Sequence, residues 1–238
     1  MNFRHSGRSP SELRPIKITP HFLSHPPGSC LIEMGGTRVV CSAMIEDSIP
    51  NWLKGQGKGW LTAEYSMLPA SSGQRIQRER NKIGGRTMEI QRLIGRSLRA
   101  AIDMNTLGER SILVDCDVID ADGGTRTASI TGSYVAVMLA LQKMSVKIPV
   151  LSQVAKQAVA AVSVGMVKGT AVLDLDYPED KDAEVDMNVV MTSEGKFIEV
   201  QGTAENEPFD RRSLDQLLQL AERGINELFQ IQKQVLMK

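Results

Sequence analysis

Two arginines follow glycine pairs at points where the apolar pattern predicts that a helix begins. One stands in Gly84-Gly85-Arg86-Thr87 and the other in Gly123-Gly124-Thr125-Arg126. The first turn of a helix carries unpaired N–H groups and the positive end of the helix dipole, and glycine lets a ligand approach the backbone closely. A guanidinium adds charge-assisted hydrogen bonds to phosphate oxygens. We therefore interpret Arg86, Gly124, Thr125 and Arg126 as a candidate phosphate site, with an ordinary turn as the alternative.

The same tetrapeptide occurs once more, as Gly35-Gly36-Thr37-Arg38, where alternating residues predict a β-hairpin instead of a helix. No helix dipole is available there. We therefore expect Arg38 to be structural, which makes it an internal control for the phosphate hypothesis.

Two carboxylates form a candidate cation site. Val185, Met187 and Val189 alternate with Asp186 and Asn188, which predicts a strand with Asp186 on its polar face. Asp180 is expected in the preceding loop, close enough to share the cation. Two carboxylates with water as the remaining ligands suit Mg²⁺ or Mn²⁺. A solvated acidic loop is the alternative.

Several other kinds of active site have no counterpart in the sequence. There is no G-x-x-x-x-G-K-[ST] loop and no G-x-S-x-G elbow. His21, His25 and Cys30 have no fourth ligand at zinc-site spacing. Histidine and cysteine chemistry is thus not favoured. The residues that remain suit inorganic phosphate, whose reactions depend on positioning and charge neutralisation.

Charge is segregated along the chain although Lys plus Arg and Asp plus Glu both number 28. Residues 54–99 carry an excess of seven positive charges, and residues 170–210 an excess of ten negative charges. The first segment could hold a polyanion and the second a divalent cation, whereas two solvated faces are the plainer interpretation.

The elements that must position these residues predict an α+β (mixed α/β) fold. With 238 residues and 42% hydrophobic composition, we expect one domain over residues 1–238.

Three scattered cysteines and the lack of a secretory signal or an 18-residue apolar run favour a cytoplasmic protein without a membrane segment. Residues 1–30 are expected to form an extended arm or an irregular lead-in. Ser213 with Gln216 predicts a capping box. Helices are expected at 87–103, 127–143 and 210–235, and strands at 29–46 (a hairpin), 111–119, 158–166, 170–176, 185–191 and 196–200. Residues 55–65 are expected to form a glycine-rich loop followed by a short strand.

Six colinear segments resemble the ribonuclease PH family, whose fold also builds the core of polynucleotide phosphorylase and of the exosome ring. The segments are Gly57–Tyr65 (GKGWLTAEY), Gly85–Arg96 (GRTMEIQRLIGR), Asp115–Val118 (DCDV), Ala121–Gly132 (ADGGTRTASITG), Val185–Val190 (VDMNVV) and Val200–Glu205 (VQGTAE).

The resemblance implies sheets packed with helices, a long C-terminal helix and a homohexamer built as a trimer of dimers. It implies a phosphate-dependent 3′→5′ exoribonuclease that trims transfer RNA precursors and other RNA 3′ ends, reversibly releasing nucleoside diphosphates, with no DNA substrate. Inorganic phosphate would be bound by Arg86, Gly124, Thr125 and Arg126, and the metal by Asp180 and Asp186. The catalytic residues would be Asp180, Asp186 and Arg126. The family also uses basic loops to bind RNA. In this chain we take the arginines of the basic segment as the candidates, namely Arg75, Arg78, Arg80, Arg92, Arg96 and Arg99, with a solvated surface loop as the alternative for the first three.

Two other functional classes were weighed against phosphorolysis. A hydrolytic nuclease would need a fuller carboxylate set and no phosphate site. An inactive RNA-binding ring subunit would have lost one of Arg86, Arg126, Asp180 and Asp186, all of which are present. Ala70 and the loop from Gly73 to Ile83 depart from the family pattern, which bears on RNA affinity and precursor preference.

Overall fold

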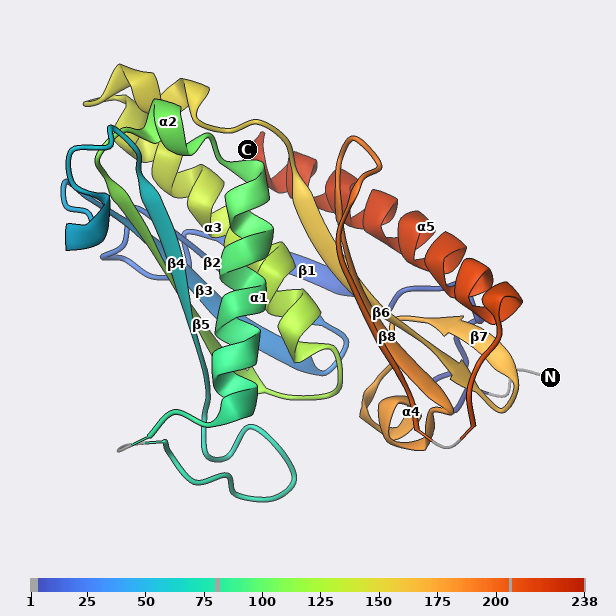
Figure 1. Cartoon of the computed structure of the whole chain (residues 1–238). Helices are drawn as coiled ribbons and strands as arrows, with labels where there is room; N and C mark the ends of the chain where they lie inside the picture. The colour runs from blue at the N-terminus through green and yellow to red at the C-terminus, as the bar shows by residue number, and fades with distance from the viewer. Residues whose placement is uncertain (1–3, 80–81, 206, 238) are drawn as a thin grey trace.

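The computed structural model describes residues 4–79, 82–205 and 207–237. In this part of the chain, two β-sheets pack with helices (Figure 1). The first sheet has the order β1-β2-β3-β5-β4, and only the β4–β5 pairing is parallel. The second is antiparallel with the order β7-β6-β8-β9. The strands are β1 (Ile16–Pro20), β2 (Gly28–Met34), β3 (Thr37–Glu46), β4 (Trp60–Met67), β5 (Ser111–Asp120), β6 (Val159–Val167), β7 (Thr170–Leu173), β8 (Val185–Thr192) and β9 (Phe197–Ala204).

One helix joins the two sheets. The α-helices are α1 (Gly85–Ala101), α2 (Met104–Leu107), α3 (Thr125–Ser145), α4 (Tyr177–Asp182) and α5 (Arg211–Leu236), with 3₁₀ turns at Asn51–Leu53 and Pro149–Gln153. Helix α3 packs on β2 and β3 of the first sheet and on β6 of the second. From Thr125 to Leu141 every residue except Arg126 is buried, as expected for a helix enclosed on all sides. Arg126 is therefore the long side chain of this stretch that extends out of the core, and Thr125 lies beside it at the edge of a cavity.

The mixed α/β fold class, the hairpin across Gly35-Gly36 and the long C-terminal helix are confirmed. Between residues 4 and 30, the extended part expected from the sequence is the strand β1, which pairs with β2 and so belongs to the first sheet. The expected strand 170–176 ends at Leu173, and the backbone turns at Asp174 with a positive φ of 54°. None of the helices described is long and apolar enough to cross a bilayer.

Two local predictions were wrong. Asp180 lies in α4 and not in a loop, because Asp176 and Glu179 form a capping box and Pro178 occupies the first turn. The N-cap of α5 is Asp210, whose carboxylate accepts a hydrogen bond from Ser213 N at 2.8 Å, and not Ser213. In both helices the cap is the aspartate directly before the first helical residue, Asp176 in α4 and Asp210 in α5.

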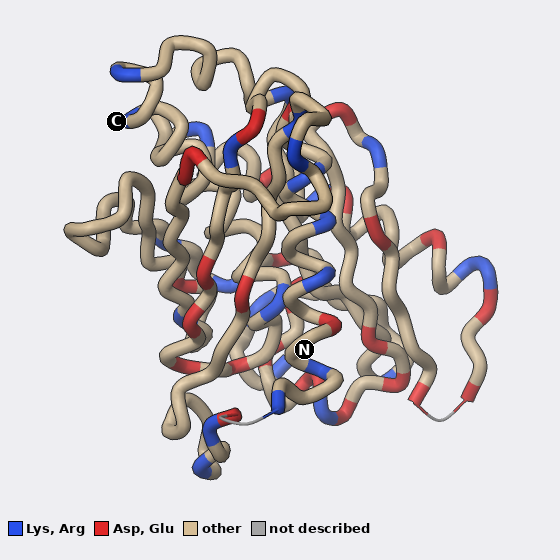
Figure 2. The backbone as a smooth tube through the Cα atoms, turned by 60° about the vertical axis from the view of Figure 1, so that its left-hand side comes forward, with Lys and Arg blue, Asp and Glu red and all other residues tan. Residues whose placement is uncertain are grey.

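The charge segregation along the sequence does not create separate basic and acidic faces in the view of Figure 2, where both signs are interspersed. Arg96 from the basic segment pairs with Glu199 from the acidic segment at 2.5 Å. Folding brings α1 and β9 together, so the two segments partly neutralise each other.

Candidate active site

A cavity of about 790 Å³ between the two sheets collects all the side chains predicted to bind phosphate and metal. Its walls come from the starts of α1 and α3, from α4, from β6 and β8, and from the loop that follows β4. The predicted residues that line it are Arg86, Gly124, Thr125, Arg126, Asp180 and Asp186. Segments separated by a hundred residues thus form one site.

The turn before α3 is held in a left-handed conformation that favours glycine. Gly123 and Gly124 have φ of 73° and 65°. A Cβ on Gly123 would lie 2.7 Å from the carbonyl oxygen of Leu175, so a larger residue does not fit. Thr37 Oγ1 donates to the Gly123 carbonyl at 2.6 Å and accepts from the Asp122 N–H at 2.9 Å. This turn leaves the first N–H groups of α3 at the cavity wall, where an anion can accept their hydrogen bonds.

The guanidinium of Arg126 is held by residues from two other elements. Its Nη1 donates to Gln201 Oε1 of β9 at 3.0 Å, and it lies 3.9 Å from Glu89 Oε2 of α1. Gln201 Nε2 in turn donates to Glu89 Oε1 at 3.1 Å. These contacts use one edge of the guanidinium. Arg86, in the first turn of α1, lines the same cavity and is exposed.

The carboxylates occupy the side of the cavity formed by the second sheet. Asp186 and Asn188 share a face of β8, and Asn188 stands in register between Ser163 of β6 and Gln201 of β9. Burial and the nearby charge of Asp186 raise the pKa of Asp180 above its ordinary value, although Arg126 and Arg86 oppose this shift. Two carboxylates that repel each other within reach of two arginines match the donor set of a divalent cation beside a phosphate.

Comparison with known proteins identifies the family. A model of the 3′ exoribonuclease family, domain 1, matches residues 12–146, and one of domain 2 matches residues 157–224. Ribonuclease PH proteins of Neisseria meningitidis serogroups C and A are each 58% identical over 233 residues, covering 97% of this chain and 96% of theirs. The chain belongs to the ribonuclease PH family. The activity of this family member is that of a phosphorolytic 3′→5′ exoribonuclease.

Solved structures share the ribonuclease PH fold. Rice Rrp46 aligns with a TM-score of 0.80 at 16% identity, covering 98% of this chain and 100% of the rice chain. A chain of the Archaeoglobus fulgidus exosome with RNA bound to the active site aligns with a TM-score of 0.79 at 20% identity, covering 96% and 92%. The phosphate-site residues fall in the first matched region and the two carboxylates in the second. One hydrophobic core spans both sheets, and the single domain over residues 1–238 stays a prediction.

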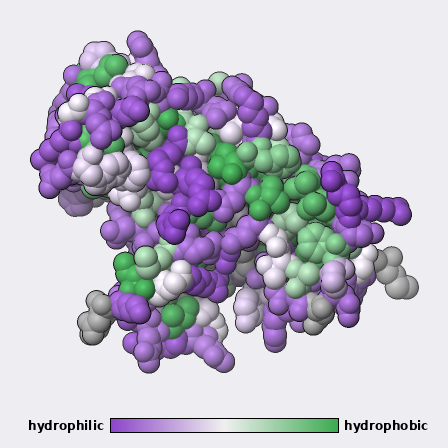
Figure 3. Space-filling view, viewed as in Figure 1, coloured by the Kyte–Doolittle hydropathy of each residue, from purple (hydrophilic) through white to green (hydrophobic). Residues whose placement is uncertain are grey.

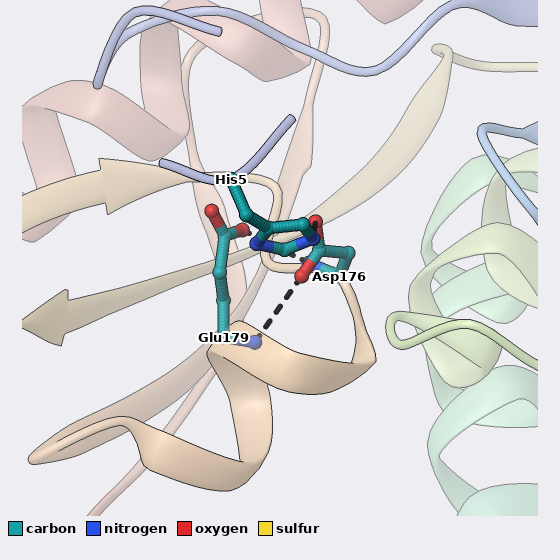
Figure 4. Close-up of side chains that lie close together, drawn as sticks. All are labelled: His5, Asp176 and Glu179. Carbon is teal, nitrogen blue, oxygen red and sulfur yellow. Dashed lines mark hydrogen bonds and ion pairs between the residues drawn. The ribbon is translucent and has the colours of Figure 1, made fainter. Parts of the chain in front are cut away.

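A second group of titratable side chains, His5, Asp176 and Glu179, lies close together outside the lining of the large cavity (Figure 4). His5 Nε2 is 3.2 Å from Asp176 Oδ2. Arg4 Nε and Nη2 donate to both oxygens of Glu179 at 2.6 and 2.7 Å, and Arg8 Nη2 lies 3.2 Å from it. Because two guanidinium groups already neutralise the carboxylates, a cation would be repelled here. We interpret the group as an ion-pair cluster.

The arginines predicted to bind RNA fall into three groups. Arg75 lines the large cavity, and Arg78 lines a neighbouring cavity of about 450 Å³ that shares Arg86 with it. Arg80 lies outside the described residues. Neither of these cavities is lined by the α1 arginines Arg92, Arg96 and Arg99.

The α1 arginines differ in how far they are available to RNA. Arg92 is exposed, and Arg96 is paired with Glu199. Arg99 donates to the Leu61 carbonyl at 2.9 Å and stacks 4.9 Å above the Trp60 ring, so it packs α1 onto β4 instead of facing solvent. Burial lowers its pKa, as does the charge of Arg96. RNA binding by these three residues stays a prediction.

Sequence reasoning missed several residues of the site. Ser163, Tyr177 and Gln74 line the cavity, and Gln201 orients Arg126. Ser163 could have been found as the one hydroxyl in the apolar strand VAAVSVGMV. Gln201 had no comparable signal, because its role depends on the register of β9 with β8.

Proposed function

We propose that this family member trims the 3′ ends of transfer RNA precursors and other RNAs, with Mg²⁺ or Mn²⁺ as cofactor and inorganic phosphate as co-substrate. The observation that carries the proposal is that two helix starts, each with one arginine, and a pair of carboxylates line the same cavity. A hydrolytic enzyme has no need of the first component. The nucleotidyl transfer would be reversible, since the product is a nucleoside diphosphate.

In this mechanism Arg86, Arg126 and the first N–H groups of α3 bind and orient the phosphate. One phosphate oxygen forms a bond to the phosphorus of the terminal phosphodiester. The bond from that phosphorus to the 3′ oxygen of the preceding nucleotide breaks, and this oxygen takes up the proton that the attacking hydrogenphosphate gives up. A divalent cation held by Asp180 and Asp186 would neutralise charge on the reacting phosphoryl group. The protein supplies positioning and charge, which fits the lack of histidine in the cavity wall among the residues described.

The loop after β4 suits a role in guiding RNA to this site. Arg75 reaches the catalytic cavity, and Arg78 lies beside the adjoining one. Phosphate contacts of this kind add affinity that is independent of base sequence. Ala70, where the family usually has arginine, is exposed at the start of this loop and contributes no charge to it.

We also propose a homohexamer in the cytoplasm. Figure 3 shows apolar residues gathered over the second sheet and α5. Phe197 and Val200 of β9 are 49% and 42% exposed, which supports burial against another copy. Three free, buried cysteines support a reducing compartment.

The test is to incubate a transfer RNA precursor, labelled in its 3′-terminal nucleotide, with and without phosphate, and to identify the released nucleotide. We expect nucleoside diphosphate only when phosphate and a divalent cation are both present. Nucleoside monophosphate released without phosphate would show hydrolysis instead. Tight RNA binding with no release in any condition would indicate an inactive binding subunit. Size-exclusion chromatography with light scattering tests the hexamer.

A further inference from the structure

A buried cluster of ion pairs lies directly behind the phosphate site. Three arginines from the segment before β1 meet three carboxylates from the turn between β7 and α4 and from α4 itself. The arginines are no more than 7% exposed, and Asp174 is fully buried. The members are Arg4, Arg8, Arg14, Asp174, Asp176 and Glu179.

Arg14 is the member that reaches the phosphate site. Its backbone N and its Nε donate to Asp174 Oδ2 at 2.8 and 3.0 Å, and its Nη2 donates to Oδ1 at 2.7 Å. From the same guanidinium, Nη1 donates to the Asp122 carbonyl and Nη2 to the Gly123 carbonyl at 3.5 Å. One side chain thus ties the turn before α3 to the turn before α4.

The fit around Arg14 is close on both sides. A Cβ on Gly124 would lie 3.0 Å from its Nη2, and a Cβ on Gly35 would lie 2.5 Å from its Cδ. Burial is the largest single effect and disfavours the charged guanidinium, but the charge and hydrogen bonds of Asp174, together with the charges of Asp122 and Asp176, raise the pKa of Arg14 overall. Only arginine offers a rigid planar set of donors that can serve a carboxylate and two carbonyls at once.

We propose that Arg14, anchored by Asp174, is a positioning residue for phosphate. By holding the carbonyls of Asp122 and Gly123 from behind, it fixes the direction of the amides that follow and the base of Arg126. It does not line the catalytic cavity, so its effect is transmitted through the backbone turn. The inference rests on the proposed phosphate site and adds to it the device that holds the site in shape.

Arg4 provides a matched control. It is as buried as Arg14, at 3% against 5% exposure, and belongs to the same cluster. Its side chain donates to Glu179 and to the carbonyls of Ser9, Glu12, Leu173 and Asp174, and not to the turn at 122–124. Replacing Arg4 therefore disturbs the ion cluster while leaving the contacts to the phosphate turn in place.

The experiment compares Arg14→Lys, Asp174→Asn and Arg4→Met with the wild type. The Michaelis constant for phosphate and kcat are measured at saturating RNA, and the thermal midpoint is followed as inorganic phosphate is added. For Arg14→Lys and Asp174→Asn we expect the phosphate KM to rise by about tenfold or more, because a displacement near 1 Å is enough for such losses. RNA affinity should stay unchanged, and the thermal shift caused by phosphate should decrease. Arg4→Met should lower the midpoint but keep the phosphate KM within about twofold.

Two results would overturn the proposal. One is a wild-type phosphate KM in folded Arg14→Lys or Asp174→Asn. The other is an equal rise in Arg4→Met, which would show that any damage to the cluster has the same effect. If the wild-type enzyme instead releases nucleotides at the same rate with and without phosphate, the proposed function is refuted, and the inference with it.

Discussion

The Tyr65 hydroxyl donates a hydrogen bond to Thr125 Oγ1 over 2.9 Å, linking β4 of the first sheet to the first turn of α3. Burial raises the pKa of Tyr65, while the contact with Thr125 and the charges of Arg86 and Arg126 oppose the rise. The phenol therefore stays protonated and donates near neutral pH. Because the threonine oxygen already accepts from Tyr65, its own proton is free to point toward an anion in the cavity.

Replacing Tyr65 by phenylalanine should leave the Thr125 hydroxyl free to rotate, while the ring still fills the same space. The loss of one neutral hydrogen bond, worth about 1 kcal/mol, predicts a rise of roughly fivefold in the phosphate KM with little change in RNA affinity. Steady-state kinetics over a phosphate titration measures it. Tyr134→Phe, further along α3, is the control and should leave the phosphate KM unchanged. A phosphate KM equal to that of the wild type in Tyr65→Phe would remove Tyr65 from the site.

Arg126→Ala and Arg86→Ala should reduce turnover at ordinary phosphate concentrations by a hundredfold or more, about 3 kcal/mol, because each removes a charge-assisted contact to the phosphate. The control is Arg38→Ala. Arg38 lies in β3, half exposed, with Glu33 and Asp120 at 3.4 and 3.3 Å, so its loss should leave phosphate dependence unchanged. Similar damage in Arg38→Ala and Arg126→Ala would contradict the assignment to a helix start.

Asp180→Asn and Asp186→Asn should each stop turnover across a full Mg²⁺ titration while RNA binding persists, because the amide keeps the shape of the side chain and loses the charge. Partial recovery of either variant at high Mn²⁺ would still fit a metal site. Normal turnover of Asp186→Asn in Mg²⁺ would not.

Asp180→Asn should also have a distinctive effect on stability when a chelator is present. The pKa of Asp180 is raised in the folded state, so its contribution to stability is present below the unfolded value of about 3.9 and is lost as the pH rises through the folded value. Near pH 7 the variant should therefore unfold at the same temperature as the wild type or slightly higher. The gain is small because the residue is open to solvent within the cavity. Thermal melts at pH 3 and pH 7 measure the difference.

Arg75→Ala and Arg78→Ala should separate two kinds of RNA contact. Arg75 lines the catalytic cavity, so its removal should weaken turnover of both short and long RNA. Arg78 lies in the adjoining cavity, where its charge opposes the rise in the pKa of Asp117 caused by burial and by Asp115. Replacing Arg78 should therefore weaken the turnover of long RNA only.

Salt dependence gives the measurement for this loop. Each lost phosphate contact reduces the slope of log affinity against log salt by about one, so Ala at Arg75, Arg78 and Arg80 together should reduce it by up to about three. An unchanged slope on a transfer RNA precursor would assign RNA binding to other residues. Arg92→Ala, on the exposed side of α1, tests the alternative surface.

The start of α5 offers a further test of stability against pH. Hydrogen bonds from the Ser213 backbone and hydroxyl lower the pKa of Asp210. This stabilisation is therefore present above about pH 4 and is lost as the pH falls through the lowered folded value. Asp210→Ala should lower the thermal midpoint at pH 7 and much less at pH 3. Gln216→Ala, which the sequence pattern made part of a capping box, should have no effect at either pH.

A feature of the fold or of the candidate site could be predicted from the sequence only where the residues that determine it lie close together in the chain. The starts of α1 and α3, the polar face of β8 and the hairpin at Gly35-Gly36 all follow from residues within a few positions of each other. The short helix α4 was missed because six residues show no period, although Asp176 and Glu179 carry the capping-box types. The contacts of Arg14 with Asp174 and of Arg126 with Gln201 join residues 160 and 75 positions apart. No local pattern encodes such a pairing, since it arises only when the two sheets pack.

The division of the cavity between the two matched regions has a consequence during synthesis. Arg86 and Arg126 are translated long before Asp180, Asp186 and Gln201. The residues of the anion site are therefore made before the carboxylates that would hold a metal and before the glutamine that orients Arg126. Contacts of such large sequence separation form late in folding. A chain that ends before Asp180 lacks part of the cavity wall, so we expect nuclease activity only after the second sheet has been made and has packed on α3.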